Sequence, residues 1–557
     1  MNPIDWAVLV LTLGGIVAYG LWHGRAAQRN MEGYLLADRR MPWYHVTLSV
    51  MATQASAITF LSAPGQAYTD GMRFVQFYFG LPLAMIVISV TFIPLFRKLK
   101  VFTAYQLLEE RFDVKTRTLT SLLFLIPRAL STGVTIAAPS IILTTILGWD
   151  LYWTNIITGA IVTIYCVFGG SRTISYTQLQ QMFVVLGGMF IAGYMAVKML
   201  PQGLGFADSL EIAGKFGKTN VLDWKFDLSN RYNVWSGFIG GFFLQLSYFG
   251  TDQSQVGRYL SGESVSESRF GLLMNGILKV PMQFFILMVG ALVFVFYQFE
   301  QPPLFFNQTE LKKVEQTPQY QSLLARDTKV FEQKKEAVSQ LATALKSDDA
   351  AAVNQSTAQV LALNKESNAL RKEAKDLMKQ TSGATDLNDT NYIFLSFVTK
   401  YLPVGMIGLL IAVILLASMG SMASAFNSLS SCTVVDIYYR LINKNGSEQH
   451  YYQFSRWVTL FWGIFCIIVA QFTANIGSLI EAVNILGSWF YGTILGVFLV
   501  AFYFKSVKGD AVFWAAILAE IAVIYCWWID LTAFLWLNLI GCVLVVLLSL
   551  LFGLFRK

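Results

Sequence analysis

Polar side chains interrupt four otherwise apolar stretches of this chain, and their types suit the binding of a cation together with a small solute. The first stretch, Val46–Tyr68, carries hydroxyl and amide side chains and ends near a Pro64–Gly65 step, which favours a broken helix. A broken helix exposes carbonyl oxygens, and these can coordinate a monovalent cation together with Ser and Thr hydroxyls. The alternative is a helix–helix interface lined by small residues. The other three stretches are Gly240–Leu260, Leu416–Tyr438 and Glu481–Val500.

The positions of the first two stretches favour a binding site over an interface. They lie about five helices apart along the chain, as corresponding members of two structural repeats do. Interrupted helices at equivalent places in two halves are the best sequence indication of a transport site near the middle of a membrane. We therefore expect the breaks near residues 52–65 and 240–252 to meet in the bilayer.

The composition indicates that the chain carrying these stretches is a membrane protein. The chain has 557 residues, of which 55% are hydrophobic and 13% charged, whereas a soluble domain has about 25% charged residues. Apolar runs of about 20 residues recur throughout, which predicts an all-α polytopic membrane protein with about 13 transmembrane helices. The expected environment and partner of the protein is then the lipid bilayer. No basic cluster with interleaved aromatics indicates nucleic acid, and no paired acid and base or metal cluster indicates an enzyme.

Lys and Arg residues gather in alternate connections between the apolar runs, as after the first run at Arg25 and after the third at Arg97. By the positive-inside rule these connections are cytoplasmic, which places the N-terminus outside and the C-terminus inside. The expected location is a plasma membrane such as a bacterial inner membrane. The polar insertion 300–392 then lies outside, and its helical spacing of apolar residues predicts a hairpin that is a lid or spacer, or alternatively a partner-binding arm.

Two basic residues fall within apolar runs. Arg128 follows Pro127 well inside its run. An intramembrane arginine is by default functional and has a partner in the bundle interior. Lys279 lies nearer a helix end, so we expect its side chain to reach toward the membrane surface.

Several segments in order identify a family resemblance. They are the Val46–Tyr68 stretch, FGGSRTISYTQLQQ (168–181), SYFGTDQSQVGRYL (247–260) and FNSLSSCTVVDIY (426–438). With them the chain resembles the sodium/solute symporter family, whose members include sodium–glucose, sodium–iodide and sodium–monocarboxylate cotransporters. The resemblance covers nearly all of the chain outside 300–392. It implies the leucine-transporter-type fold, a five-plus-five inverted repeat with extra helices before and after.

The resemblance also implies a division of the chain. An N-terminal extra helix and cytoplasmic loop (1–42) precede the first repeat (43–200). An outer loop (201–233) leads to the second repeat (234–504), which the 300–392 insertion interrupts. Extra helices (505–557) end the chain.

The resemblance implies one sodium site. Its ligands correspond to backbone carbonyls on the first core helix and to carbonyl and hydroxyl oxygens on the eighth, which are Ala52, Ala55, Ala417, Gly420 and Ser421. The family usually has Ser in place of Gly420, so the site lacks a side-chain oxygen unless a water, Thr53 or Ser424 supplies it. A second sodium site found in some members needs an acidic residue where this chain has Gln178, and we expect that site to be absent. Gln178 beside Arg128 would also leave the arginine free to bind an anionic substrate.

The substrate-binding positions implied by the resemblance are Gln54, Thr59, Tyr78, Gln245, Tyr248 and Asn484. Tyr248 resembles an inner gate residue, and Arg128, Gln178 and Tyr248 are the expected gating or coupling residues. Amide and hydroxyl groups bind sugars, polyols and small carboxylates equally well.

These observations predict sodium-coupled symport of a small polar organic solute into the cell by alternating access. The solute is a sugar or polyol, a sialic-acid-like molecule or a carboxylate. A proton-coupled or uncoupled transporter of the same fold is the nearest alternative, and a transporter-like solute sensor is a remote one.

Overall fold

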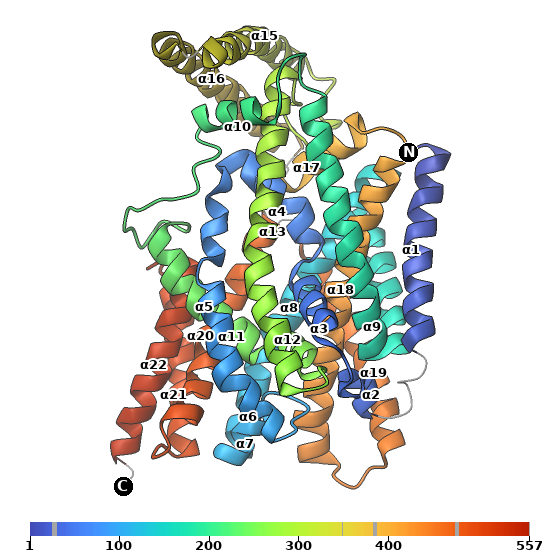
Figure 1. The fold of residues 1–557 in the computed structure, drawn as a ribbon, viewed down its shortest axis with the longest axis vertical. Helices are drawn as coiled ribbons and strands as arrows, with labels where there is room; N and C mark the ends of the chain where they lie inside the picture. Colours follow the sequence, from blue (N-terminus) through green and yellow to red (C-terminus); the bar gives the residue numbers. More distant parts are fainter. Residues whose placement is uncertain (25–30, 348, 383–386, 474–477, 556–557) are drawn as a thin grey trace.

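The computed structural model describes residues 1–24, 31–347, 349–382, 387–473 and 478–555, and its regular elements in these ranges are helices, apart from an isolated bridge between Met41 and Gly262. Figure 1 shows a bundle of long helices, with a helical hairpin across one end and the C-terminus at the other. We call these the hairpin end and the C-terminal end. The N-terminus lies toward the hairpin end (Figure 1).

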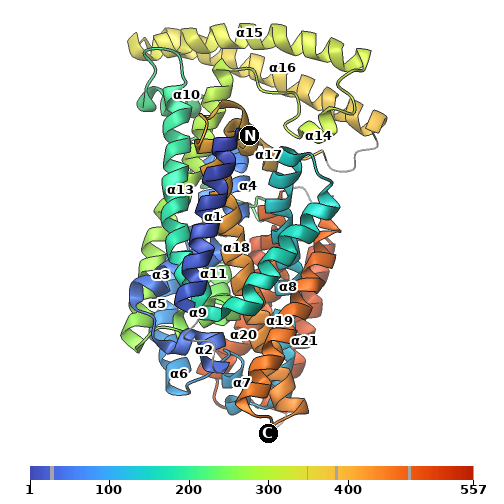
Figure 2. The ribbon, with the colours of Figure 1, turned by 90° about the vertical axis from the view of Figure 1, so that its right-hand side faces the viewer.

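The long helices of the bundle carry apolar side chains on most sides, as membrane-spanning helices do. Short helices α2 (Met31–Leu36) and α7 (Gln106–Arg111) lie toward the C-terminal end, and α10 (Phe206–Lys215) lies beneath the hairpin (Figures 1 and 2). The long elements are α1 (Pro3–Gly24), α8 (Val114–Leu147), α9 (Leu151–Lys198), α13 (Val265–Phe299), α18 (Met406–Cys432), α19 (Glu448–Ala470), α20 (Leu479–Tyr503), α21 (Gly509–Trp528) and α22 (Phe534–Phe555).

Within the described ranges, 10 helices are long and apolar enough to cross a membrane, or up to 11 when a bent pair counts as one span. This count does not confirm the expected 13 spans. Helix α9 has 48 residues, and at about 1.5 Å per residue it is roughly twice as long as the hydrocarbon core is thick. Gly170 interrupts it with φ 61°. The count of 13 stays a prediction, which requires two spans in α9 and one in the broken helix 241–260.

The first polar stretch is a broken helix, as predicted. Helix α3 (Trp43–Gln54) and helix α4 (Ala57–Asp70) meet at an angle of 59°. The break lies at Ala55 and Ser56, and α4 continues through the Pro64–Gly65 step. Gly65 instead allows α4 to pack closely against the backbone at Thr390, because a Cβ at Gly65 would lie 2.0 Å from the carbonyl oxygen of Thr390.

The second polar stretch is also broken, as predicted. Helix α11 (Gly241–Thr251) and helix α12 (Gln253–Leu260) are separated by Asp252, whose backbone is extended (φ −75°, ψ 118°). The Asp252 carboxylate accepts a hydrogen bond from the backbone of Ser254 at 2.8 Å and so caps the start of α12. The chain thus breaks this helix at an acidic residue rather than at a proline or glycine.

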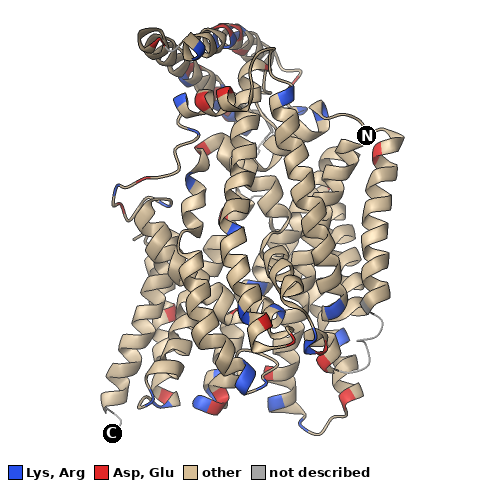
Figure 3. Ribbon diagram, in the orientation of Figure 1, with Lys and Arg blue, Asp and Glu red and all other residues tan. Residues whose placement is uncertain are grey.

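The insertion forms the expected helical hairpin. Helices α15 (Pro318–Ser347) and α16 (Ala350–Ser382) lie antiparallel across the hairpin end of the bundle (Figure 2). The hairpin is docked on the bundle, because Arg371 and Lys375 of α16 pair with Asp389, which directly precedes α17 (Thr390–Tyr401). Figure 3 shows charged residues concentrated at the hairpin and toward the C-terminal end, with fewer between them.

Candidate functional site

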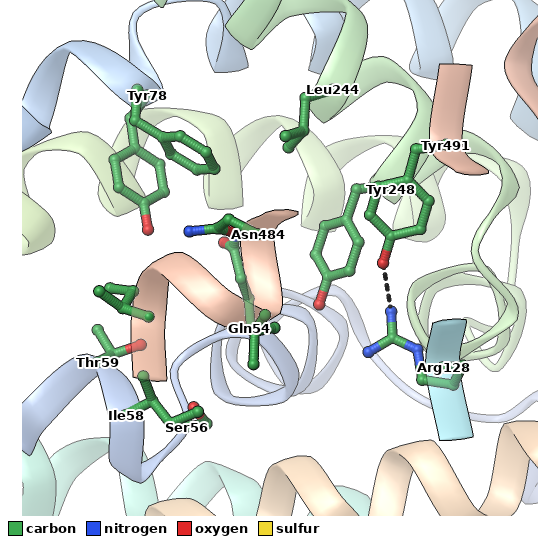
Figure 4. Close-up of a pocket in the computed structure, with 13 residues that line it drawn as sticks. Gln54, Ser56, Ile58, Thr59, Tyr78, Arg128, Leu244, Tyr248, Asn484 and Tyr491 are labelled. Carbon is green, nitrogen blue, oxygen red and sulfur yellow. Dashed lines mark hydrogen bonds between the residues drawn. The ribbon is translucent and has the colours of Figure 1, made fainter. Parts of the chain in front are cut away.

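A cavity of about 80 Å³ lies beside the first helix break, between α4, the 3₁₀ helix η3 (Met72–Tyr78), α11 and α20. All the predicted substrate-binding residues except Gln245 line it, although they come from distant parts of the chain. Figure 4 shows Thr59 and Tyr78 toward one end of the cavity and Tyr248 and Arg128 toward the other. The lining residues predicted from sequence are Gln54, Thr59, Tyr78, Tyr248, Asn484 and Arg128.

Gln245 does not line this cavity. Its side chain is completely buried, and neither amide atom forms a hydrogen bond in the described part of the chain. Burying an amide without partners costs free energy, so the environment of Gln245 is suited to a ligand or water that is not bonded to it here. Its role in binding stays a prediction.

Arg128 has a carboxylate partner, which corrects the expectation of an uncompensated charge. Its guanidinium pairs with Asp252 and donates a hydrogen bond to the Tyr491 hydroxyl at 2.9 Å. The Tyr491 hydroxyl in turn donates to Asp252 at 3.0 Å, which closes a three-residue network. The extended backbone at Asp252 allows its carboxylate to reach α8. Sequence reasoning missed this pair, although an acidic residue inside an apolar span was a usable signal.

Tyr248 stands beside this network. Its ring lies 5.5 Å from the Arg128 guanidinium carbon and 5.7 Å from the Tyr491 ring, and the two tyrosines lie side by side in Figure 4. Its hydroxyl accepts a hydrogen bond from Gln255 at 2.8 Å. Sequence reasoning singled out Tyr248 but not Tyr491. The gate function of Tyr248 stays a prediction.

The predicted sodium ligands lie at the first break and on α18. The Ser56 N–H donates to the Gln54 carbonyl at 3.0 Å, so the Ala52 carbonyl lacks its usual helical donor four residues later. On the other side, the Ser421 hydroxyl donates to the Ala417 carbonyl at 3.2 Å. The break and α18 are joined by Thr53 and Ser424, whose hydroxyl oxygens are 2.9 Å apart.

Gln178 connects these elements instead of lying beside Arg128, which corrects the expected pairing. Its amide nitrogen lies 3.1 Å from the Thr53 hydroxyl, 3.0 Å from the Gly420 carbonyl and 2.9 Å from the Ser424 hydroxyl. Its amide oxygen accepts a hydrogen bond from Ser49 at 2.5 Å. The neutral amide of Gln178 therefore uses oxygens of α3 and α18 that would otherwise be available to a cation.

Gln181 is a residue that sequence reasoning missed. It lies one helical turn after Gln178, is buried, and its amide oxygen forms no hydrogen bond among the described residues. A Cβ at Gly420 would lie 2.4 Å from this oxygen. The Gln181 oxygen therefore occupies space that a side chain at residue 420 would take. The three-residue spacing of Gln178 and Gln181, which puts both on one helix face, was the available signal.

Contrary to the expectation from the sequence, the side chain of Lys279 does not reach toward the membrane surface but is buried inside the bundle. It is 0% exposed, because α13 packs inside the bundle against α3, α4 and α5 (Leu81–Val87). Its ammonium forms no hydrogen bond or ion pair with any described residue and lies 5.9 Å from the centroid of the Tyr78 ring. Since Tyr78 lines the cavity, a buried amine without a hydrogen-bond partner lies near the site.

Two broken helices, a polar cavity beside one of them, and carbonyl and hydroxyl oxygens at the first break define this protein as a multi-pass membrane protein with the architecture of a secondary transporter. A family model for the sodium:solute symporter family matches residues 34–308 and 376–519. The chain belongs to this family, whose members are transporters and not enzymes. The region between the two matched segments contains most of the hairpin.

Individual relatives agree with this assignment. The chain is 30% identical to the human sodium/iodide cotransporter over 59% of this chain and 50% of that protein. It is 32% identical to the human sodium-coupled monocarboxylate transporter 1 over 49% of this chain and 44% of that protein. The chain thus spans about half the length of these two relatives. With the sodium/sialic acid symporter of Proteus mirabilis the identity is 26% over 94% of this chain and 89% of that protein.

A solved structure of a Na⁺-coupled sialic acid symporter, in a substrate-bound outward-open state, has the same fold. Its TM-score is 0.77 at 22% sequence identity, and the match covers 100% of this chain and 98% of that one. This similarity confirms the leucine-transporter-type fold expected from the sequence. The division of the chain into two repeats at the expected boundaries stays a prediction.

Proposed function

We propose that this protein is a sodium-coupled symporter that carries a small monocarboxylate into the cell by alternating access. The observation that carries the proposal is the unpaired ammonium of Lys279 beside the cavity. The other two charges at the site, Arg128 and Asp252, neutralise each other. Lys279 is therefore an ionisable group beside the site that has no partner among the described residues, and an anionic ligand would stabilise its charged form.

The remaining lining groups suit a carboxylate. Gln54 and Asn484 lie near the middle of the cavity in Figure 4, and each has an amide that can donate hydrogen bonds to carboxylate oxygens. The cavity volume of about 80 Å³ favours a small solute over a large acid sugar. The relatives named for iodide, monocarboxylates and sialic acid all have an anion or an acid in their names.

For the sodium ion we propose the predicted site at the first helix break, with one change of ligand. The carbonyl oxygens of Ala52, Ala55 and Ala417 and the hydroxyl of Ser421 supply four oxygens. Gly420 supplies no hydroxyl, and the amide oxygen of Gln181 takes that role. A buried carbonyl oxygen without a hydrogen-bond donor is costly unless it binds a cation, and the Gln181 oxygen is in that state.

The second sodium site is proposed to be absent. The amide nitrogen of Gln178 already lies within hydrogen-bond distance of Thr53, Gly420 and Ser424. A second sodium ion would need a carboxylate at this position. The amide of Gln178 stands there instead, and its N–H groups compete with a cation for the same oxygen atoms. Coupling then uses a single sodium ion, and Gln178 holds α3 and α18 together.

We propose that the hairpin end faces the outside and the C-terminal end faces the cytoplasm of a bacterial-type plasma membrane. The positive-inside rule supports this orientation, because Figure 3 shows Lys and Arg gathered toward the C-terminal end, where α6 (Ile93–Lys98), which ends in Arg97 and Lys98, lies in Figure 1. Sodium flowing inward would then enter from the hairpin side together with the solute.

Uptake by the purified protein in liposomes tests the proposal. The solutes are radiolabelled acetate, lactate, iodide, N-acetylneuraminate, glucose and inositol, each with an inward sodium gradient or with potassium in its place at fixed pH. We expect uptake of a monocarboxylate that requires sodium and is lost in Lys279→Gln. The exposed Lys198→Gln is the matched control. Uptake that follows a proton gradient, or that ignores both ions, would support the alternative coupling modes, and preferred uptake of glucose or inositol would contradict the anion assignment.

A further inference from the structure

The hairpin encloses a second cavity against the bundle, which we call the hairpin cavity. Its volume is about 240 Å³. On one side it is lined by Tyr68 and Thr69 from the last turn of α4 and by Phe294 of α13, and on the other by α15 and α16. Most of the hairpin falls outside the segments matched by the family model, so the α15 and α16 side of this cavity is not part of that match.

One face of α16 presents polar side chains to the hairpin cavity. Asn364, Ser367, Asn368, Arg371 and Lys375 recur at helical spacing and all line it. An adjacent stripe of the same helix, with Leu370, Ala374 and Met378, is buried in the small apolar core that holds the hairpin together. The polar face is therefore turned toward the cavity and is only partly exposed to solvent.

The charges around the hairpin cavity are unbalanced in favour of positive ones. The basic residues that line it are Lys218, Lys334, Arg371 and Lys375, and the acidic ones are Asp327 and Asp389. Asp389 is already engaged, since it pairs with both Arg371 and Lys375 and accepts a hydrogen bond from the Phe306 backbone at 2.8 Å.

Lys334 is the group that points to a ligand. It is 3% exposed and lines the cavity, its ammonium lies 6.0 Å from the Phe331 ring centroid, and Asp327 attracts it without a salt bridge or hydrogen bond among the described residues. The neighbouring Asp327 instead accepts a hydrogen bond from Gln301 at 3.2 Å. Lys218 supplies a second ammonium, which donates to the Thr69 carbonyl and lies 4.7 Å from the Phe294 ring. Buried ammonium groups with spare donors are suited to an anion.

The hairpin cavity is linked to the central site through α4. Thr59 lines the central cavity, and Tyr68 and Thr69 lie further along the same helix in the hairpin cavity. A third cavity of about 560 Å³ is lined by Gln66 of α4 and shares Thr69 and Lys218 with the hairpin cavity. An anion held under the hairpin is therefore adjacent to this third cavity.

We propose that the hairpin cavity is a capture site for a small monocarboxylate, held by Lys334 and Lys218 under the polar face of α16. That the captured anion is the transported solute depends on the proposed function, whereas anion binding under the hairpin does not. A capture site raises the local concentration of the solute at the mouth of the transporter. The hairpin is then part of the binding machinery and not a passive cover.

The test uses the full-length protein in detergent, with potassium in place of sodium. Trifluoroacetate is the probe, because it is a small monocarboxylate whose binding can be followed by ¹⁹F NMR titration. Trifluoroacetamide is its neutral counterpart. The variants are Lys334→Gln and Lys218→Gln in the hairpin cavity, Lys335→Gln at the adjacent exposed position of α15, and Lys279→Gln at the central site.

We expect trifluoroacetate to bind the unmodified protein, trifluoroacetamide to bind at least tenfold more weakly, and Lys334→Gln to weaken trifluoroacetate binding at least fivefold. Lys218→Gln should weaken it in the same direction, so the result does not depend on the folding of one variant. Lys335→Gln should leave it unchanged, whereas Lys279→Gln should remove only the binding that occurs at the central site. The proposal would be overturned if the unmodified protein did not bind trifluoroacetate, if Lys334→Gln and Lys218→Gln both bound it as tightly as the unmodified protein, or if Lys279→Gln abolished all binding. Failure of sodium-dependent uptake would count against the proposed function but not against this site.

Discussion

Asp252 interrupts the second broken helix, and its carboxylate pairs with the guanidinium of Arg128 on α8. The side chain of Asp252 is completely buried and that of Arg128 is 11% exposed. The break between α11 and α12 is therefore tied to a separate helix by a buried ion pair, with Tyr491 of α20 hydrogen-bonded to both partners. A movement of α12 relative to α8 has to preserve or replace this network.

The first prediction concerns this pair. Asp252→Asn leaves the Arg128 charge without its partner in a buried site, and breaking such a pair costs about 3–5 kcal/mol. We expect a clear fall in the apparent melting temperature in detergent and a loss of solute uptake. Arg231→Gln is the control, because its pair with Glu481 is exposed on the arginine side (55%) and exposed pairs contribute only about 0–1 kcal/mol. Unchanged stability and uptake in Asp252→Asn would refute the structural role of the pair.

The second prediction concerns the fifth sodium oxygen. Gln181→Ala removes the amide oxygen that lies where a side chain at residue 420 would be, so the sodium concentration needed to stabilise the protein against heat should rise about tenfold. Adding Gly420→Ser to Gln181→Ala should restore part of the affinity, because the smaller residue leaves room for the new hydroxyl. Gly420→Ser alone should be harmful, since its Cβ meets the Gln181 oxygen. If Gln181→Ala keeps the original sodium response, the assignment of this ligand fails.

The third prediction concerns the close packing of α4. Gly65→Ala places a Cβ 2.0 Å from the Thr390 carbonyl oxygen, which is backbone and cannot move aside easily. Overpacking of this kind costs about 1–3 kcal/mol, so we expect a lower melting temperature and lower yield of folded protein. Gly187→Ala on α9 is the matched control, because a Cβ there has nothing within 4 Å. Equal behaviour of the two variants would show that α4 and α17 are not closely packed.

The fourth prediction is a pH dependence of anion binding under the hairpin. Burial lowers the pKa of Lys334 and the pKa of Lys218 from 10.5 to about 8. Asp327 on α15 opposes this shift at Lys334 and Arg371 on α16 adds to it, while Asp70 of α4 opposes it at Lys218. Both ammonium groups lose their protons as the pH rises through about 8, so trifluoroacetate affinity should be highest below pH 8 and fall about tenfold between pH 7 and 9.

The contribution of these two lysines to folding stability changes with pH in the opposite direction to their contribution to anion affinity. Because their pKa is lower in the folded than in the unfolded chain, the unfolded chain binds more protons between pH 8 and 10.5, and their contribution to stability rises with pH over that interval. Titrations of binding and of melting temperature on the same samples separate the two effects. Affinity that stays constant from pH 7 to 9 would contradict a role for these ammonium groups.

Much of the molecule follows from local features of the sequence. Apolar runs of bilayer length predict membrane helices whatever surrounds them, and the polar residues near 52–65 and 240–252 correctly mark the two breaks. The break itself, however, lies at Ala55 and Ser56 rather than at the Pro64–Gly65 step. A proline tolerated inside a helix cannot be told from one that ends it without knowing what packs around it.

The sequence by itself determined the fold class, the hairpin and the residue types that line the central cavity, because these depend on hydropathy, helical spacing and recognisable motifs. Only the tertiary structure decided which charges are paired. Arg128 pairs with Asp252, more than a hundred residues away along the chain, whereas Lys279, placed by the sequence near a helix end, is buried and unpaired inside the bundle. The physical reason is that the free energy of a buried charge depends on which neighbours the folded chain brings within a few ångströms, and spacing along one helix does not specify those neighbours.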